Sequence, residues 1–164
     1  TDTTTPTVSV FASDFADVCN GVPLAQAAAY SDTTGIHAAL LFDRESSTDS
    51  YYQKSFTLPE AWEKPWEQAV ETELVTCVTT VPKEFAESCP FDGDTGASYT
   101  LNTYAADYTV ELYSAQDGKQ LATTTISLPA DECPTYHYFT DTTENAYPDY
   151  KQSLTDFLKP YVQK

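Results

Sequence analysis

The residues of this 164-residue chain that could do chemistry are four cysteines, two histidines and two aspartates in a glycine-containing loop. An even number of cysteines, with no Cys-x-x-Cys pair and no Cys/His cluster, is typical of two disulfides rather than of a metal site. Disulfides persist in oxidising compartments, so we expect an extracellular or cell-surface protein, secreted or anchored. The four residues are Cys19, Cys77, Cys89 and Cys133.

The pairing of these cysteines has three possible forms. Residues 73–80 and 85–91 are predicted to form a hairpin around Pro82, in which Cys77 faces Cys89. We therefore favour Cys77–Cys89 together with Cys19–Cys133. The alternative of Cys19–Cys77 with Cys89–Cys133 stays open. Either way, no thiol remains to act as a nucleophile.

The histidines and the aspartate loop are weighed against simple structural roles. His37 lies in an apolar run, which favours a buried, hydrogen-bonded histidine over a metal ligand, and His137 is 100 residues away. Asp92 and Asp94 flank Gly93 like half of a calcium loop, but the distal glutamate of such a loop is missing. A plain turn is favoured there, with Asp92 and Asp94 as the remaining calcium candidate. We expect no cofactor.

No catalytic motif is recognisable. The chain has no Gly-x-Ser-x-Gly sequence, which argues against a serine hydrolase of that type. A pair of carboxylates suited to glycoside hydrolysis cannot be chosen from 25 Asp and Glu residues, because the distances between them in space are not visible in a sequence.

The charge of the chain limits its partners. Eight Lys and Arg residues stand against 25 Asp and Glu, which gives a formal net charge of −17. Nucleic-acid binding needs a cationic surface, so nucleic acid is excluded as a partner, and anionic membranes are disfavoured. No apolar run approaches the roughly 18–20 residues of a membrane span. The acidity suits a solvated surface, adaptation to high salt or recognition of a cationic partner.

Aromatic side chains gather in predicted loops. Twelve tyrosines and two tryptophans are present, and aromatic clusters with polar rims are typical of contact surfaces. The alternative is that the two tryptophans anchor a loop onto the sheet. The candidate binding surface comprises Trp62, Trp66, Tyr136, Tyr138 and Phe139.

Hydrophobic periodicity predicts the elements that hold these residues. Residues 104–112 alternate as a strand, 116–119 form a turn, 120–128 return as a second strand, and an amphipathic helix begins near Pro148. Residues 1–12 are predicted to be a tether or a short strand, and residues 13–164 a single domain. The fold class is α+β: an antiparallel sheet of about five strands, with the C-terminal helix packed on one face and two disulfides as staples.

Several short motifs resemble a family of uncharacterised extracytoplasmic domains in bacterial secreted, lipoprotein or membrane-anchored proteins. The resemblance implies a disulfide-containing domain with no assigned activity and no assigned catalytic residues. His37-Ala38 stands where the family has His-Pro. The motifs are AAAY (27–30), GIH (35–37), LPEAW (58–62), ELVTCV (73–78), ESC (87–89), YTVELYSAQDGK (108–119), ECP (132–134) and FLKPYV (157–162).

These observations predict a non-catalytic extracellular sensor or interaction domain that binds an unknown protein or small ligand. One alternative is a subunit of a surface assembly that uses its N-terminal strand for contact. The other is a secreted carbohydrate-active hydrolase. Both a monomer and a homo-oligomer are compatible with the sequence.

Overall fold

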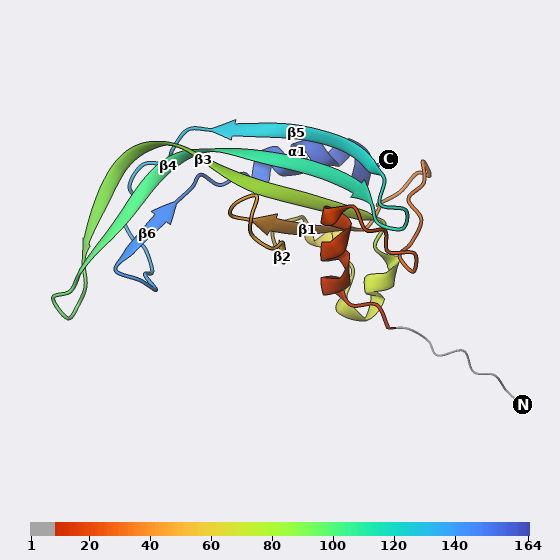
Figure 1. Cartoon of the computed structure of the whole chain (residues 1–164), viewed down its shortest axis with the longest axis horizontal. Coiled ribbons are helices and arrows are strands. Elements are labelled where there is room, and N and C mark those ends of the chain that lie inside the picture. The colour runs from red at the N-terminus through yellow and green to blue at the C-terminus, as the bar shows by residue number, and fades with distance from the viewer. Residues whose placement is uncertain (1–8) are drawn as a thin grey trace, which may run out of the picture.

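The computed structural model describes residues 9–164 as a mixed six-stranded sheet with a C-terminal helix (Figure 1). The strands are β1 (Ala39–Arg44), β2 (Tyr52–Gln53), β3 (Leu74–Asp92), β4 (Ser98–Ser114), β5 (Gln120–Leu128) and β6 (Thr143–Ala146). The helices are α1 (Lys151–Val162) and the 3₁₀ helices η1 (Ala12–Asn20), η2 (Glu60–Trp62) and η3 (Trp66–Glu71). The predicted tether or short strand over residues 1–12 falls mostly on residues 1–8, which lie outside the described residues; η1 already begins at Ala12.

The sheet is mixed, and the prediction of a purely antiparallel sheet is wrong. The strand order is β2-β1-β3-β4-β5, and β6 joins the outer edge of β4. The pairs β1–β3 and β4–β6 are parallel, with Ala39 opposite Leu74 and Thr100 opposite Thr143. Parallel neighbours need a long crossover connection, which residues 45–73 supply between β1 and β3 and residues 115–142, including β5, supply between β4 and β6.

Apolar cores lie on both faces of the body of the sheet. Strand β1 and the first seven residues of β3 are covered by α1 on one face and by η1 on the other, which explains why residues 39–42 and 74–80 are buried without alternation. On the α1 face, Leu154 and Leu158 pack in the same core as Val110. On the opposite face, Phe15 of η1 packs in the same core as Phe42.

The alternation predicted for residues 104–112 is confirmed over most of β4. Its α1 face buries Ala106, Tyr108, Val110 and Leu112. The C-terminal helix is confirmed too, but it begins at Lys151 rather than near Pro148, and the Asp149 carboxylate accepts a hydrogen bond from the Lys151 backbone N–H.

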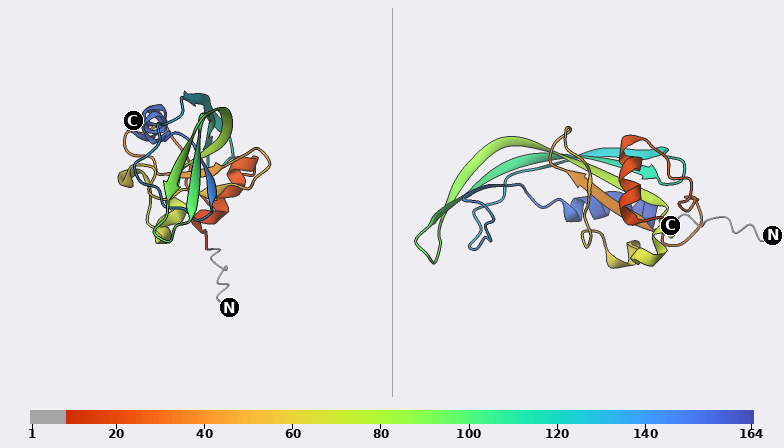
Figure 2. Two further views of the ribbon diagram at one scale, coloured as in Figure 1. Left: turned by 90° about the vertical axis from the view of Figure 1, so that its left-hand side faces the viewer. Right: turned by 60° about the horizontal axis from the view of Figure 1, so that its bottom comes forward.

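The predicted hairpin around Pro82 does not form. Strand β3 instead runs through this position as one strand of 19 residues, with register irregularities between Pro82 and Glu87. The actual turn is at Gly93–Ala97, where Gly96 has a φ of 77° that favours glycine. Residues 82–105 therefore form a two-stranded extension, here called the arm, which curves away from the body (Figures 1 and 2).

The disulfide pairing follows from this long strand and corrects the favoured pairing. Cys77 and Cys89 lie on the same strand, so at about 3.3 Å per residue they are roughly 40 Å apart and cannot be joined. The bonds are Cys19–Cys77 and Cys89–Cys133, each with a Cα–Cα distance of 5.6 Å. For sequence separations of 58 and 44 residues, the loop-entropy relation gives a stabilisation of about 4 kcal/mol each.

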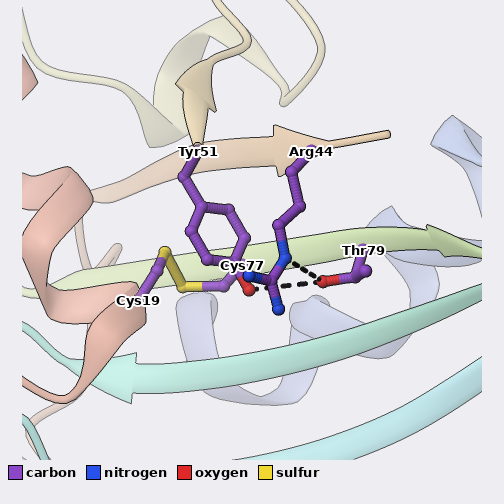
Figure 3. The surroundings of a disulfide bond; sticks show 5 residues. All are labelled: Cys19, Arg44, Tyr51, Cys77 and Thr79. Atoms are coloured by element: carbon purple, nitrogen blue, oxygen red, sulfur yellow. Dashed lines mark hydrogen bonds between the residues drawn. A yellow bond between two sulfur atoms is a disulfide. The ribbon is translucent and has the colours of Figure 1, made fainter. Parts of the chain in front are cut away.

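The two disulfides connect different parts of the molecule. Cys19–Cys77 ties η1 to β3, beside the ring of Tyr51 (Figure 3). The Arg44 guanidinium carbon lies over the same ring, 4.4 Å from its centroid. Cys89–Cys133 ties the segment that precedes β6 to the arm. One bond therefore staples the body, and the other staples the extension.

Trypsin can test this pairing because each cysteine falls in a different limit peptide. Cleavage after Arg44, Lys54, Lys83, Lys119 and Lys151 separates the four cysteines. Under non-reducing conditions, mass spectrometry is expected to find peptide 1–44 joined to 55–83, and 84–119 joined to 120–151. A bond between 55–83 and 84–119 would contradict the fold, because it would require the hairpin that β3 replaces.

Candidate binding surface at the end of the arm

The end of the arm is covered on one face by the segment that joins β5 to β6. Cys133 anchors this segment to Cys89, and β6 then pairs with residues 100–103 of β4 (Figure 2). Together they leave a hollow of about 390 Å³, here called the arm-end pocket. Its lining comprises Phe91, Asp92, Gly93, Asp94, Tyr99, Thr135, Tyr136, His137, Tyr138 and Phe139.

Packed aromatic rings make one side of the pocket. Phe139 contacts Phe91 edge-on and stacks on Tyr99, with ring centroids 5.2 Å and 5.1 Å away. His137 meets Phe139 edge-on at 4.6 Å. Phe91 and Tyr99 are opposite each other across β3 and β4, so the two strands present their rings to one incoming segment.

Glu144 fixes the conformation of that segment. Its carboxylate accepts hydrogen bonds from His137 Nε2 at 2.9 Å, from the Thr140 backbone N–H and hydroxyl at 2.6 Å and 2.9 Å, and from the Asp141 backbone N–H at 3.0 Å. These bonds, the one from His137 first, lower the pKa of Glu144 from its ordinary value of 4.5 to about 2. A single carboxylate therefore binds three residues of the segment from 137 to 141 through four hydrogen bonds.

The rim of the pocket is exposed, aromatic and acidic. Tyr136 and Tyr138 are 77% and 76% exposed, which is unusual for two large rings in a segment held by a disulfide. Asp92 and Asp94 are exposed on the facing turn. Residues 84–104 and 130–146 contain no Lys or Arg. Their acidic residues are Glu84, Glu87, Asp92, Asp94, Asp131, Glu132, Asp141 and Glu144.

The structure separates the five residues of the predicted binding surface. Tyr136, Tyr138 and Phe139 lie together at the arm-end pocket. Trp62 is only 2% exposed and packs in the core under α1, as the alternative of an anchoring role predicts. Trp66 is 75% exposed, but it belongs to η3, which lies at the body, away from the arm (Figures 1 and 2).

The pocket also contains residues that the sequence did not assign to a binding surface. Phe91 and Tyr99 join it because Cys133 pairs with Cys89, and the correct pairing would have been the signal for them. Asp92 and Asp94, the calcium candidate, stand on a turn that closes through its own backbone: Gly93 N–H donates to Ala97 O at 2.8 Å. Asp92 and Asp94 therefore lie where β3 turns into β4.

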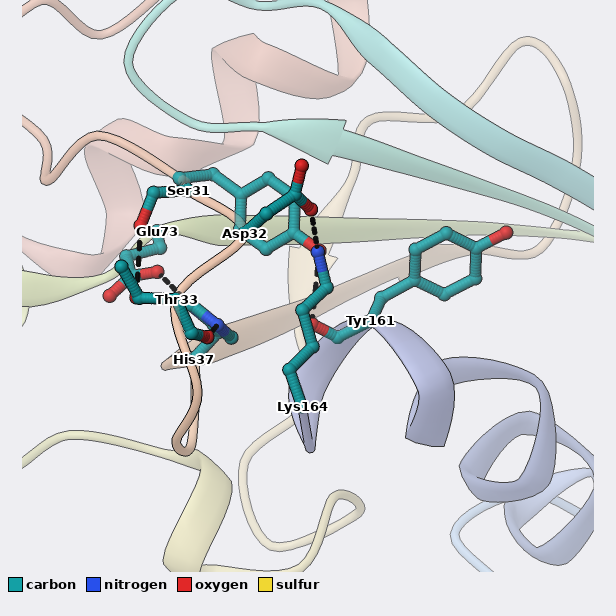
Figure 4. Close-up of polar contacts among 8 residues, drawn as sticks. Ser31, Asp32, Thr33, His37, Glu73, Tyr161 and Lys164 are labelled. Carbon is teal, nitrogen blue, oxygen red and sulfur yellow. Dashed lines mark hydrogen bonds and ion pairs between the residues drawn. The ribbon is translucent and has the colours of Figure 1, made fainter.

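His37 has the buried, hydrogen-bonded role that the sequence favoured. The ring is 3% exposed; its Nδ1 contacts the Glu73 carboxylate, and its Nε2 contacts the Thr33 carbonyl oxygen at 2.9 Å (Figure 4). Both ring nitrogens are therefore occupied, and neither is available to activate a nucleophile. His37 N–H also donates to Val162 O, so the residue ties the end of α1 to the sheet.

A larger groove of about 840 Å³ lies between the β1–β2 connection and residues 147–150. Several of its residues bind one another: Tyr150 Oη donates to Asp43, Lys54 forms an ion pair with the same carboxylate, and the Tyr108 hydroxyl donates to Pro148 O. Burial raises the pKa of Tyr108 and of Tyr150 above the usual value for a phenol, so both donate as neutral hydroxyls. This arrangement holds the β6–α1 connection against the body.

One cluster among the described residues brings three possible metal ligands together, namely Glu87, Cys89 and Cys133. The two sulfur atoms are joined in a disulfide and offer no thiolate, so the cluster does not have the donor set of a metal site.

Comparisons with known proteins identify no relative of this chain. No family model, no curated protein and no solved structure matches this chain. Within residues 9–164, no helix has both the length and the apolar character needed to cross a membrane.

The pKa of Glu144 predicts how order at the arm end depends on pH. Because the folded state lowers this pKa, the stabilisation is complete above about pH 4.5 and is lost as the pH falls toward 2. Hydrogen exchange at the Thr140 and Asp141 amides, corrected for intrinsic rates, should slow at neutral pH in the wild type relative to Glu144→Gln. The two proteins should become alike near pH 2.

Asp141→Asn is the matched control, because it removes a neighbouring exposed carboxylate but keeps the backbone donor to Glu144. It should exchange like the wild type. Equal protection in Glu144→Gln and wild type at pH 7 would show that this carboxylate does not order the segment.

Proposed function

We propose that this protein is a non-catalytic interaction domain of an extracellular or cell-surface protein, and that its arm-end pocket binds a basic segment of a protein partner. The observation that carries the proposal is the pair Tyr136 and Tyr138, exposed on a segment that a disulfide anchors to the arm, with no Lys or Arg in residues 84–104 and 130–146. Two disulfides support the oxidising setting. The resemblance to bacterial extracytoplasmic domains fits the same setting and stays a prediction.

The chemistry of the pocket suits a guanidinium or ammonium group. A cation over a tyrosine ring gains about 0.5–2 kcal/mol, and carboxylates at the rim add charge-assisted hydrogen bonds. A planar guanidinium can also stack on a ring such as Tyr136 while it binds Asp92 or Asp94. His137 is the one basic side chain at the pocket, and its Nε2 is already bound to Glu144.

Rigidity supports binding at this place rather than elsewhere on an acidic surface. Any part of a molecule with a net charge of −17 attracts cations at long range, which favours encounter but gives no specificity. At the arm end, the disulfide, the strand β6 and the Glu144 hydrogen bonds hold the backbone segment that carries the two tyrosines before a ligand arrives. Preorganised groups lose less entropy on binding, so a localised site is expected there.

The test is isothermal titration calorimetry, in which an arginine-containing peptide is titrated into the protein. The control is a peptide of the same length in which glutamine replaces arginine. We expect the wild type to bind the arginine peptide. Tyr136→Ala/Tyr138→Ala should weaken this binding at least about tenfold, as loss of about 1.4 kcal/mol of cation–π contact implies. Asp92→Asn/Asp94→Asn should weaken it and reduce its dependence on salt.

Matched controls separate a site from general attraction. Trp66→Ala removes an equally exposed ring from the body, and Glu67→Gln/Glu71→Gln removes two carboxylates from η3. Neither should change the affinity more than about twofold. If the body variants weaken binding as much as the arm variants, the attraction is only general electrostatics and the proposal fails.

A further inference from the structure

The larger groove on the body differs in character from the arm-end pocket. Strand β1 ends at Arg44, whereas its neighbour β3 continues into the arm (Figure 1). The chain leaves the sheet over residues 45–51 and returns as β2, and these segments line the groove together with residues 147–150. Its volume of about 840 Å³ is that of a small-molecule site. The hollow is here called the β1-end groove.

The inner side of the groove is held by contacts within the protein. The rings of Tyr108 and Tyr150 pack with their centroids 4.5 Å apart. The Tyr108 hydroxyl donates to Pro148 O, and the Tyr150 hydroxyl donates to Asp43. These two phenols are used by the fold, so a ligand must be bound by other lining residues.

Two further tyrosines offer ring surface to a ligand. Tyr52 of β2 is 69% exposed and lies directly opposite Asp43 in the β1–β2 pair, which places both side chains on the same face of the sheet. Tyr147 is partly buried, and burial together with the Glu45 carboxylate raises its pKa, so its hydroxyl stays protonated. Each ring presents an apolar face with a polar group at its end.

Hydrogen-bond acceptors and donors lie together around these rings. Both contacts of Asp43, from Tyr150 Oη and from Lys54 Nζ, are to Oδ2, so within residues 9–164 its Oδ1 has no partner. The Lys54 ammonium carries three donors and uses one of them on Asp43. Glu45 and Gln53 add an exposed carboxylate and an exposed amide.

This combination of groups selects one class of ligand. A lipid chain would leave the carboxylates and the ammonium of the groove without partners. An anion would be repelled by the four carboxylates, and a simple cation would meet Lys54. A sugar hydroxyl both donates and accepts, so neighbouring hydroxyls can bind a carboxylate and an ammonium together. The C–H face of a pyranose ring is apolar and packs on an aromatic ring. The carboxylates belong to Asp43, Glu45, Asp49 and Asp149.

We propose that the β1-end groove binds a neutral saccharide, with a sugar ring stacked on Tyr52 and its hydroxyls bound to Asp43 Oδ1 and Lys54 Nζ. This site is independent of the arm-end pocket, because the two hollows have no lining residue in common. The groove supplies both cationic and anionic groups, whereas the lining of the arm-end pocket contains no Lys or Arg. The domain would then hold a glycan at its body and a basic protein segment at its arm.

The test is a ¹⁵N–¹H NMR titration of the full chain with three neutral disaccharides, namely cellobiose, maltose and lactose. At least one of them should shift the amides of the β1-end groove at millimolar concentration and leave those of the arm-end pocket unchanged. Tyr52→Ala should weaken this binding at least about tenfold, because it removes the stacking ring. Tyr52→Phe keeps the ring and should bind within about threefold of the wild type. The amide spectrum outside the groove reports whether each variant is folded.

Tyr136→Ala/Tyr138→Ala is the matched control, because it removes two exposed tyrosines from the arm-end pocket. It should bind the disaccharide like the wild type, so a failure of the saccharide site and a failure of the peptide site are seen separately. The proposal is overturned if no disaccharide shifts the groove amides, if binding survives Tyr52→Ala, or if the control variant loses it. A groove that responds to tetramethylammonium chloride but to no disaccharide would be a cation site, which also overturns the proposal.

Discussion

The bond between Cys89 and Cys133 is the constraint on which the arm depends. A two-stranded ribbon is marginally stable by itself in water, and the helices of residues 9–164 lie at the body rather than along the arm (Figure 1). The disulfide holds the β5–β6 connection on one face of the ribbon, where His137 and Phe139 meet Phe91 and Tyr99. The same connection then delivers β6 as a third strand. One covalent link thus turns an extension into an ordered surface.

The body and the arm are stabilised by different forces. The body has two apolar cores, one under α1 and one under η1, and there the Cys19–Cys77 bond adds to an already dense interior. The buried apolar residues of the arm are Cys89 and Leu101. Its remaining stabilisation comes from aromatic stacking and from the hydrogen bonds of Glu144. Because its stability does not rest on burying aromatic residues completely, the arm can leave Tyr136 and Tyr138 in contact with solvent.

Local patterns predicted the elements whose neighbours are close in sequence. The alternation of β4, the turn before β5, β5 itself and the stripe of α1 were all readable, because each depends on side chains a few positions apart. The parallel pairs β1–β3 and β4–β6 depend on long crossovers and leave no local signal. Pro82 was misleading because proline usually marks a turn, whereas on an unpaired strand edge it is tolerated.

The error at Pro82 also explains which part of the binding surface was missed. A hairpin there paired Cys77 with Cys89 and left Cys133 to pair with Cys19, so residues 133–139 had no defined neighbour on the sheet. Their aromatic side chains and their position in a predicted loop still singled out Tyr136, Tyr138 and Phe139. Trp62 could not be distinguished from them. Its burial depends on the packing of α1, which is distant in the sequence.

The central claim is that the Cys89–Cys133 bond creates the binding surface. The most direct measurement compares calorimetric binding of the arginine peptide by the wild type and by Cys89→Ser/Cys133→Ser, with circular dichroism to follow the body. The account predicts that the variant keeps a folded body through its cores and the Cys19–Cys77 bond but loses binding. A variant that binds the peptide with wild-type affinity would contradict the account.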